Sequence, residues 1–194
     1  LSRHTTFRIG GFADYFVCAG KDELAPVIAL CRREGISYFL IGNGSNLLVA
    51  DAGYRGVVIK LDSSSSCAFV EAGDFVKVRV GAGELLSVFA REVIAKGAAG
   101  FAFAAGIPGS VGGALYMNAG AYGGEISDFL VGVQVLTENV KIVFMPREEL
   151  EFSYRSSIFQ NREIYALSAD FCFPRGDARA EQRRIEELSA LRRG

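Results

Sequence analysis

A glycine-rich loop near the N-terminus has the residue types of an anion cradle. The loop, Gly42-Asn43-Gly44-Ser45-Asn46, lies between two apolar runs, Ser37–Ile41 and Leu47–Val49, which we expect to be strands. Its glycines allow left-handed backbone and bring N–H groups close to a ligand, while Ser45 and Asn46 add side-chain donors. No lysine follows the glycines and no G-x-G-x-x-G opens a helix, so the loop is neither a Walker nor a Rossmann motif. The spacing fits a pyrophosphate cradle, and equally a tight turn between strands.

The longest stretch without a charged side chain runs from Gly97 to Gly124 and contains nine glycines. Its length would suit a membrane span, but the glycines, Pro108, Ser110 and Asn118 argue against one. An exposed apolar segment of this length is unfavourable, and a buried one must satisfy its backbone. A large, flat cofactor lying across the segment would meet both demands, so we favour a cofactor site over a packed glycine-rich turn.

Arg155 lies among aromatic and hydroxyl side chains in the segment Phe152–Phe159, FSYRSSIF. A guanidinium can hold a carboxylate through two parallel hydrogen bonds. From composition alone, however, a solvated arginine in an ordinary loop is the better interpretation.

Several other kinds of site lack the residues they need. The single histidine, His4, lies at the N-terminus, which makes a Ser-His-Asp hydrolase improbable. The four cysteines form no CxxC pair, so we expect no metal site. We expect Cys18, Cys31 and Cys172 to be small buried side chains in a protein from a reducing compartment. A net charge of −1 offers no positive field for nucleic acid or an anionic membrane, and no apolar signal sequence follows Leu1, so we expect a cytoplasmic protein.

Hydrophobic periodicity predicts the elements that must position these segments. Helices are predicted where apolar residues recur three and four apart, at Asp22–Glu34, Glu84–Lys96 and Asp177–Arg193. Further strands are predicted at Ala13–Cys18, Val57–Leu61, Cys67–Glu71, Phe75–Val80, Phe129–Glu138, Lys141–Phe144 and Glu163–Phe173. This order indicates an α+β or mixed α/β fold. The serine run Ser63–Ser66 reads as an exposed turn and marks a plausible boundary between a small βαββ-like part and a larger one.

The motifs, in this order, resemble the UDP-N-acetylenolpyruvoylglucosamine reductase (MurB) family. The resemblance covers nearly the whole chain, and its long middle motif is highly specific. The matching segments are TTFRIGG at Thr5–Gly11, IGNGSNLLV at Ile41–Val49, AGIPGSVGGALYMNAGAYGGEI at Ala105–Ile126 and YRSSIF at Tyr154–Phe159.

The resemblance implies an α+β, FAD-binding fold of the PCMH/vanillyl-alcohol-oxidase type, with subdomains at residues 1–62 and 63–194. In the family, NADPH reduces a flavin, which passes a hydride to the enolpyruvyl double bond of a UDP-sugar and yields UDP-N-acetylmuramate for peptidoglycan. The resemblance implies FAD as the cofactor and makes Arg155 catalytic, because a fixed cation stabilises the enolate-like charge. No His or Cys lies in a clear flavin-attachment motif, so we expect the FAD to be non-covalent. It implies substrate contacts from Tyr154 and Asn118. The cofactor-binding residues it implies are Gly42, Asn43, Gly44, Ser45, Asn46, Ala105, Gly106, Pro108, Gly109, Ser110, Gly112 and Gly113.

The family continues into a substrate-binding domain with a proton-donating serine and a catalytic glutamate, and neither has a counterpart before Gly194. We therefore expect either part of a longer reductase or a protein that binds FAD and reduces the sugar poorly. Two other hypotheses stay open, another FAD oxidoreductase of the same fold and a catalytically silent FAD-binding module. The expected partners are a UDP-sugar and NADPH, without nucleic acid or membrane, and the expected assembly is a monomer.

Overall fold

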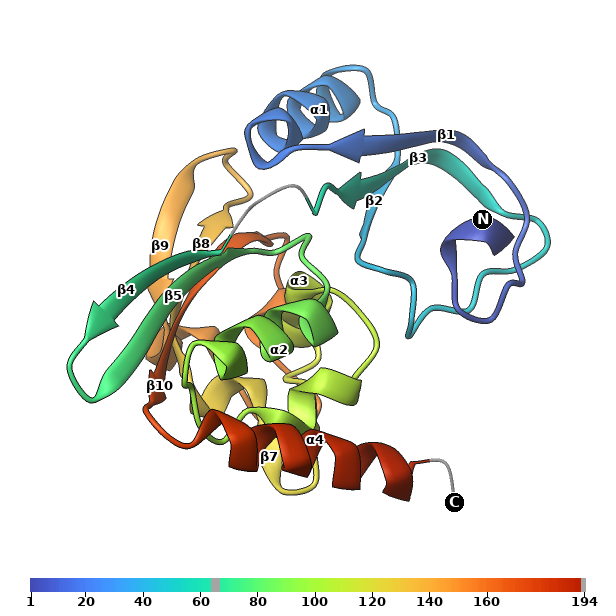
Figure 1. Ribbon diagram of the computed structural model, residues 1–194. Coiled ribbons are helices and arrows are strands. Elements are labelled where there is room, and N and C mark those ends of the chain that lie inside the picture. Colours follow the sequence, from blue (N-terminus) through green and yellow to red (C-terminus); the bar gives the residue numbers. More distant parts are fainter. Residues whose placement is uncertain (64–66, 193–194) are drawn as a thin grey trace.

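The computed structural model describes residues 1–63 and 67–192 and contains a small parallel sheet near the N-terminus (Figure 1). Strands β1 (Ala13–Ala19), β3 (Tyr54–Leu61) and β2 (Tyr38–Ile41) lie in the order β1-β3-β2, all parallel. Helix α1 (Lys21–Arg33) makes the crossover from β1 to β2 and packs on one face of this small sheet. It buries Leu24, Ile28 and Cys31, which recur three and four apart as an amphipathic helix requires.

A larger antiparallel sheet follows, with strand order β4-β5-β10-β8-β9. Its central strand β10 pairs with β5 on one side and β8 on the other. Two hairpins, β4–β5 and β8–β9, supply the remaining strands, as the turn residues between them predict. The bounds are β4 Ala68–Ala72, β5 Phe75–Gly81, β8 Leu130–Leu136, β9 Ile142–Pro146 and β10 Tyr165–Pro174.

Helix α2 (Leu86–Ala95) packs against β5 of the large sheet, and α4 (Ala178–Leu191) packs on α2 and on the segment 102–106; a cluster of phenylalanine rings lies in the core beside them. Phe101 is fully buried, and its ring centre lies 4.9 Å from that of Phe173 and 5.7 Å from that of Phe89. The remaining elements are short: η1 Ser2–His4, η2 Ala102–Gly106, α3 Val111–Tyr116, β6 Gly120–Ala121, β7 Gly124–Glu125, η3 Ile126–Asp128, η4 Arg147–Leu150 and η5 Ile158–Gln160.

The predicted helices and most predicted strands are confirmed within a few residues. The strand expected at Leu47–Val49 is wrong, because this segment forms no strand ladder and Leu47 turns into a pocket. Cys31 is buried as expected, but Cys18 is exposed and Cys172 only partly buried. Both of these lie at strand positions that point away from the core, where the pleat places alternate side chains.

The proposed boundary at residue 62 stays a prediction. The small sheet ends at Leu61 and the large sheet begins at Ala68, while one hydrophobic core contains residues of both. Part of the serine turn, 64–66, and the end of the last predicted helix, 193, lie outside the described residues.

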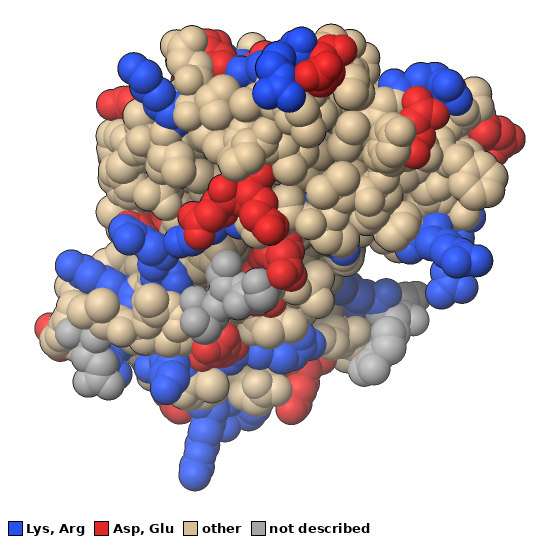
Figure 2. Space-filling model, turned by 90° about the horizontal axis from the view of Figure 1, so that it is seen from above, with Lys and Arg blue, Asp and Glu red and all other residues tan. Residues whose placement is uncertain are grey.

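Two further features of the described residues are the length of the apolar helices and the distribution of charged side chains on the surface. In the described ranges 1–63 and 67–192, no helix is both long and apolar enough to cross a membrane. Figure 2 shows acidic and basic side chains interspersed over the face that it displays.

Candidate functional site

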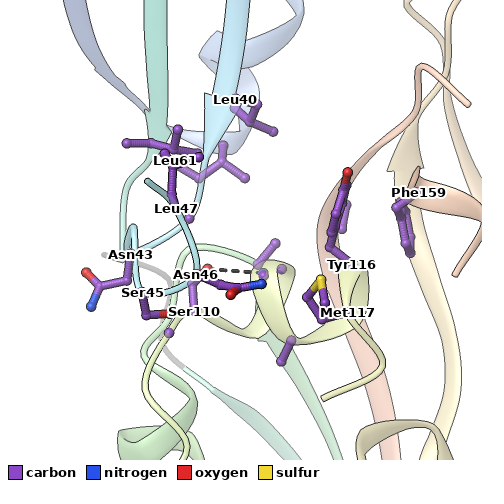
Figure 3. A pocket seen from close by; sticks show the side chains of 18 of the residues that line it. Leu40, Asn43, Ser45, Asn46, Leu47, Leu61, Ser110, Tyr116, Met117 and Phe159 are labelled. Carbon is purple, nitrogen blue, oxygen red and sulfur yellow. Dashed lines mark hydrogen bonds between the residues drawn. The ribbon is translucent and has the colours of Figure 1, made fainter. Parts of the chain in front are cut away.

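A cavity of about 770 Å³ lies where the small sheet meets the large sheet and α3 (Figure 3). The volume falls in the range of about 300–1,000 Å³ that is typical of small-molecule and cofactor sites. One wall comes from β2, the loop after it and the end of β3; the other comes from residues 107–119 and 155–166. The lining side chains and backbone include residues 38–47, 60, 61, 82, 83, 107–110, 112–114, 116, 117, 119, 155, 159 and 162–166.

The glycine loop of residues 42–46 forms part of the first wall, as its sequence predicts. Ser45 Oγ donates to the carbonyl of Pro108 at 3.1 Å, which joins the loop to the opposite wall. Gly44 has φ +64°, and a Cβ there would lie 2.1 Å from the carbonyl oxygen of His4. A Cβ on Gly42 would lie 2.5 Å from Ser110 Oγ. At Gly44 a side chain would collide with fixed backbone, so glycine is required there, and both glycines line the cavity without a side chain.

The opposite wall begins with the second glycine motif. Ser110 caps α3, and its Oγ accepts from the N–H of Gly113 at 3.2 Å. Gly109 has φ +128°, and a Cβ on Gly112 would lie 3.1 Å from Ala82 Cβ. Pro108, Gly109, Ser110, Gly112 and Gly113 all line the cavity.

Ala105 and Gly106, expected in the same cofactor path, lie outside the cavity lining. Ala105 is buried in the core. A Cβ on Gly106 would meet the guanidinium of Arg192, on the side where the end of α4 packs. The structure thus brings together the part of this motif from Pro108 onward.

Arg155 lies on the cavity wall at the tip of a tight turn. Ser153 and Ser156 exchange backbone hydrogen bonds of 3.1 Å, and Arg155 itself has φ +55°. Its Nη2 donates to the carbonyl of Gly120 at 2.9 Å, and its own carbonyl accepts from Gln160 Nε2 at 3.0 Å. A non-glycine residue held in left-handed backbone is a recurring feature of functional sites, and the turn holds this cation in place.

Asn118 and Tyr154, expected to contact a substrate, do not line the cavity. Asn118 is 1% exposed, and its amide nitrogen donates to Glu125 Oε2 at 2.7 Å and to the Ser153 carbonyl at 3.0 Å. It therefore supports the turn that carries Arg155. Tyr154 is exposed at that turn, with the Arg155 guanidinium 5.8 Å from its ring centre.

Several lining residues escaped the sequence-based prediction. Lys60 on β3 donates to Asn43 Oδ1 at 3.3 Å and places a cation beside the glycine loop. Its charge interrupts the apolar run Val57–Leu61, a signal that could have identified it. Tyr116, Met117 and Phe159 form an apolar side of the cavity (Figure 3). Their positions depend on a long-range contact, since Ser157 Oγ donates to the Tyr116 carbonyl at 2.8 Å, and no local pattern reveals it.

The described residues hold no cluster of three or more His, Cys, Asp or Glu side chains that could bind a metal ion. A model of the FAD binding domain family matches residues 13–145, from β1 to β9, and so includes both glycine motifs of the cavity. The chain belongs to this FAD-binding family. FAD is therefore its cofactor, and the glycine-lined cavity with Lys60 at its edge suits a long, flat molecule with a diphosphate.

A curated relative confirms the resemblance between this FAD-binding chain and the reductase family. The UDP-N-acetylenolpyruvoylglucosamine reductase of Lachnoclostridium phytofermentans is 49% identical over the whole of this chain. The aligned part is 63% of that relative, so the FAD-binding chain spans less than two thirds of its length.

Solved structures confirm the fold. The crystal structure of UDP-N-acetylenolpyruvylglucosamine reductase (MurB) from Thermus caldophilus matches with a TM-score of 0.79 and 31% identity, over 99% of this chain and 67% of that one. A VAO-type flavoprotein from Myceliophthora thermophila matches with a TM-score of 0.59 and 13% identity, over 80% of this chain and 31% of that one. At that identity the second likeness concerns the fold alone, and it fits the predicted α+β architecture of the PCMH/vanillyl-alcohol-oxidase type.

Proposed function

We propose that this chain carries the FAD site of an enzyme that reduces UDP-N-acetylenolpyruvoylglucosamine with NADPH to UDP-N-acetylmuramate, a peptidoglycan precursor. The observation that carries the proposal is the 49% identity to a reductase of that name along the whole chain. The enzyme would act in the cytoplasm as a monomer, without nucleic acid or membrane as a partner. Because the relative is longer, parts of the enzyme beyond these residues would supply the proton donor for the substrate.

The two glycine segments would hold non-covalent FAD between them. The loop of residues 42–46 approaches closely enough to surround a diphosphate with backbone, and Lys60 adds a positive charge 3.3 Å from Asn43. Residues 108–113 would lie along the rest of the cofactor, with the buried Ala105 supporting them from the core side and the exposed Gly106 connecting the two. When bound, FAD supplies the hydride-transfer chemistry that side chains lack.

Arg155 would act on the substrate. Reduction of an enolpyruvyl double bond drives negative charge toward the neighbouring carboxylate. A guanidinium fixed at that carboxylate stabilises the charge more in the transition state than in the ground state. Arg155 is already held by its turn and by the Gly120 carbonyl, so little reorganisation is needed.

Asn118 and Tyr154 would serve the same turn in different ways. Asn118 would act through the turn, since its amide holds the Ser153 carbonyl rather than facing the cavity. Tyr154 is exposed next to Arg155 and would contact the part of a substrate that extends beyond the cavity.

The test is an assay of the protein that contains this chain, with NADPH and UDP-N-acetylenolpyruvoylglucosamine, followed by NADPH oxidation and by mass spectrometry of the product. We expect turnover, and Arg155→Asn should lower kcat about 10²–10³-fold. Asparagine tolerates left-handed backbone, so this variant removes the cation without straining the turn.

Arg91→Asn is the matched control. Arg91 also donates to a single backbone carbonyl, that of Ser87 at 3.0 Å, but it lies on the exposed face of α2. It should leave kcat unchanged. A yellow protein that oxidises no NADPH with this sugar would instead favour another FAD oxidoreductase of this fold, and a protein without FAD would contradict the cofactor site itself.

A further inference from the structure

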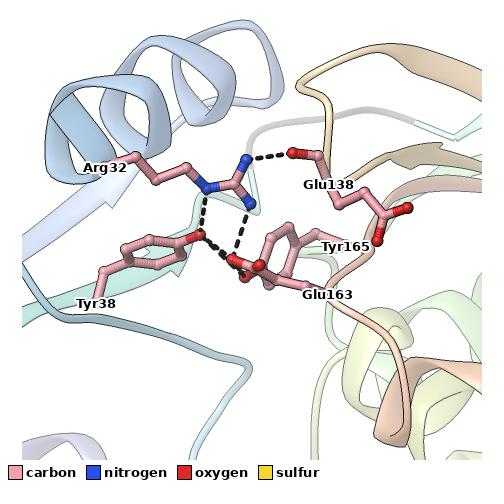
Figure 4. A network of polar contacts seen from close by, with 5 residues as sticks. All are labelled: Arg32, Tyr38, Glu138, Glu163 and Tyr165. Atoms are coloured by element: carbon pink, nitrogen blue, oxygen red, sulfur yellow. Dashed lines mark hydrogen bonds and ion pairs between the residues drawn. The ribbon is translucent and has the colours of Figure 1, made fainter.

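A polar cluster joins the two walls of the cavity (Figure 4). It includes Tyr38 at the start of β2, whereas the glycine loop follows the other end of that strand. Arg32 on α1 and Tyr38 on β2 belong to the small sheet and its helix. Glu163 precedes β10, and Tyr165 is its first residue, so both belong to the other wall. Tyr38, Glu163 and Tyr165 line the cavity, and the cluster therefore closes it at one end. We call these four residues the clasp.

One carboxylate oxygen is the centre of the clasp. Glu163 Oε1 accepts from Arg32 Nη2 at 2.8 Å and from the hydroxyl of Tyr38. Arg32 Nε in turn donates to the Tyr38 hydroxyl at 3.0 Å. The Tyr165 hydroxyl lies 3.3 Å from the same carboxylate oxygen and 3.5 Å from the Tyr38 hydroxyl.

Arg32 also reaches a second point on the opposite wall, because its Nη1 donates to the carbonyl of Glu138 in the β8–β9 turn. Glu138 and Glu163 are 106 and 131 residues away from Arg32 along the chain. The contacts that join the two walls are therefore long-range, whereas those from Arg32 to Tyr38 and from Tyr165 to Glu163 lie within one wall.

The directions of the pKa shifts show that these groups interact with one another. The hydrogen bond from Tyr38, followed by that from Arg32, lowers the pKa of Glu163. Burial is the largest cause that raises the pKa of both tyrosines, and the hydrogen bond to Glu163 adds to it for Tyr38. The cluster thus holds a carboxylate, a guanidinium and two neutral phenols at neutral pH. A network of this kind is worth more than an isolated exposed ion pair.

The clasp bridges the two walls at one end of the cavity, and three of its four residues line that cavity. The walls also meet at the glycine loop, where Ser45 donates to the Pro108 carbonyl. A ligand between the walls is therefore enclosed by the Ser45–Pro108 hydrogen bond at one end and by the clasp at the other. Separating the walls at the clasp end would break at least three hydrogen bonds at once.

We propose that Arg32, Tyr38, Glu163 and Tyr165 are positioning residues that hold the two walls together and set how slowly FAD leaves the cavity. This inference rests on the FAD site of the proposed function and adds a determinant of cofactor retention outside the glycine motifs.

The experiment compares FAD release and apoprotein unfolding in five proteins: wild type, Tyr38→Phe, Glu163→Gln, Arg32→Met and the double variant Arg32→Met/Glu163→Gln. FAD release is followed by the recovery of flavin fluorescence after dilution, and unfolding by denaturant titration. Each single variant should release FAD about tenfold faster, since each loses the equivalent of one or two net hydrogen bonds between the walls. Arg32→Met alone completes a double-mutant cycle, in which the effects on the FAD dissociation rate should be clearly less than additive.

Asp170→Asn is the matched control. Asp170 receives two hydrogen bonds of 2.6 Å from Arg79, but both residues lie on paired strands of the large sheet. This variant breaks a strong charged contact without separating the walls, so its FAD release should stay within about twofold of wild type. Comparison of its unfolding midpoint with its FAD dissociation rate shows how much a general loss of stability alone changes FAD release.

Two results would overturn the clasp. If the clasp variants lower the unfolding midpoint but release FAD no faster than Asp170→Asn, the cluster is only structural. Equal release rates in all variants would lead to the same conclusion. Failure of the wild type to bind FAD would contradict the proposed function as well. The two failures can therefore be distinguished, because the clasp alone is wrong only when the wild type binds FAD normally.

Discussion

At the scale of single residues, the glycine loop makes the most direct prediction. Gly44 and Gly35 both have φ +64°, but a Cβ on Gly44 would meet the His4 carbonyl while a Cβ on Gly35 would meet nothing within 4 Å. Gly35→Ala should therefore lower the free energy of unfolding by about 1 kcal/mol, for the backbone conformation alone. Gly44→Ala should lower it by at least about 2 kcal/mol more, because the N-terminal segment must move.

Denaturant unfolding of the two variants measures this difference in the free energy of unfolding. Titration of the folded proteins with FAD then measures whether the affinity for the cofactor also changes. Gly44→Ala should also weaken FAD binding, since the displaced segment supports the cofactor loop, whereas Gly35→Ala should bind FAD like the wild type. Equal losses of stability in both variants would mean that His4 yields easily and that the loop tolerates a side chain.

The sequence predicted that residues 42–46 form a candidate site. It did not decide whether these residues bind a diphosphate or only make a tight turn between strands. The choice depends on atoms far along the chain, such as the Pro108 carbonyl and Ser110 Oγ. Arg155 is a similar case. Composition favoured a solvated loop arginine, and the contacts that fix it come from Gly120 and Gln160, which no local pattern connects to it.

At the scale of elements, the phenylalanine cluster under η2 holds the second glycine motif in position. Phe101 packs between α2 and β10 and directly precedes η2, which leads to the cavity wall at Pro108. Phe101→Ala should lower the free energy of unfolding by about 3–5 kcal/mol, because it leaves a large cavity in the core. Phe12→Ala, at a side chain that is 92% exposed, should change it by no more than about 0.5 kcal/mol. Urea unfolding of both variants tests this, and a small loss for Phe101→Ala would mean that the neighbouring rings collapse into the space.

Long amphipathic elements could be predicted from the sequence, and short ones in the glycine stretch could not. The periodic patterns of α1 and α4 and the hairpin turns are local signals, and they predicted these elements within a few residues. Helix α3 has six residues, of which two are glycines, so its intrinsic helix propensity is low. It forms because Ser110 caps it locally and because the N–H of Gly112 donates to the Ala82 carbonyl at 2.8 Å, a long-range contact that exists only in the folded protein.

At the scale of the whole molecule, the joining of the two walls should depend on pH through Glu163. Arg32, Tyr38 and Tyr165 face this carboxylate, and the hydrogen bond from Tyr38 is the largest cause of its lowered pKa. A carboxyl whose pKa is lower in the folded state stabilises that state above its unfolded pKa of about 4.3. This stabilisation is lost as the pH falls through the folded pKa.

The wild type should therefore lose stability more steeply than Glu163→Gln when the pH falls below about 5, and the two curves should converge in acid. Unfolding midpoints measured across this range test the expectation. The effect on FAD release should follow the same course, with the wild type approaching the rate of Glu163→Gln as the carboxylate is protonated. Parallel stability curves for the two proteins would show that Glu163 is no more ionised in the folded protein than in the unfolded chain, and the clasp would then hold the walls without its charge.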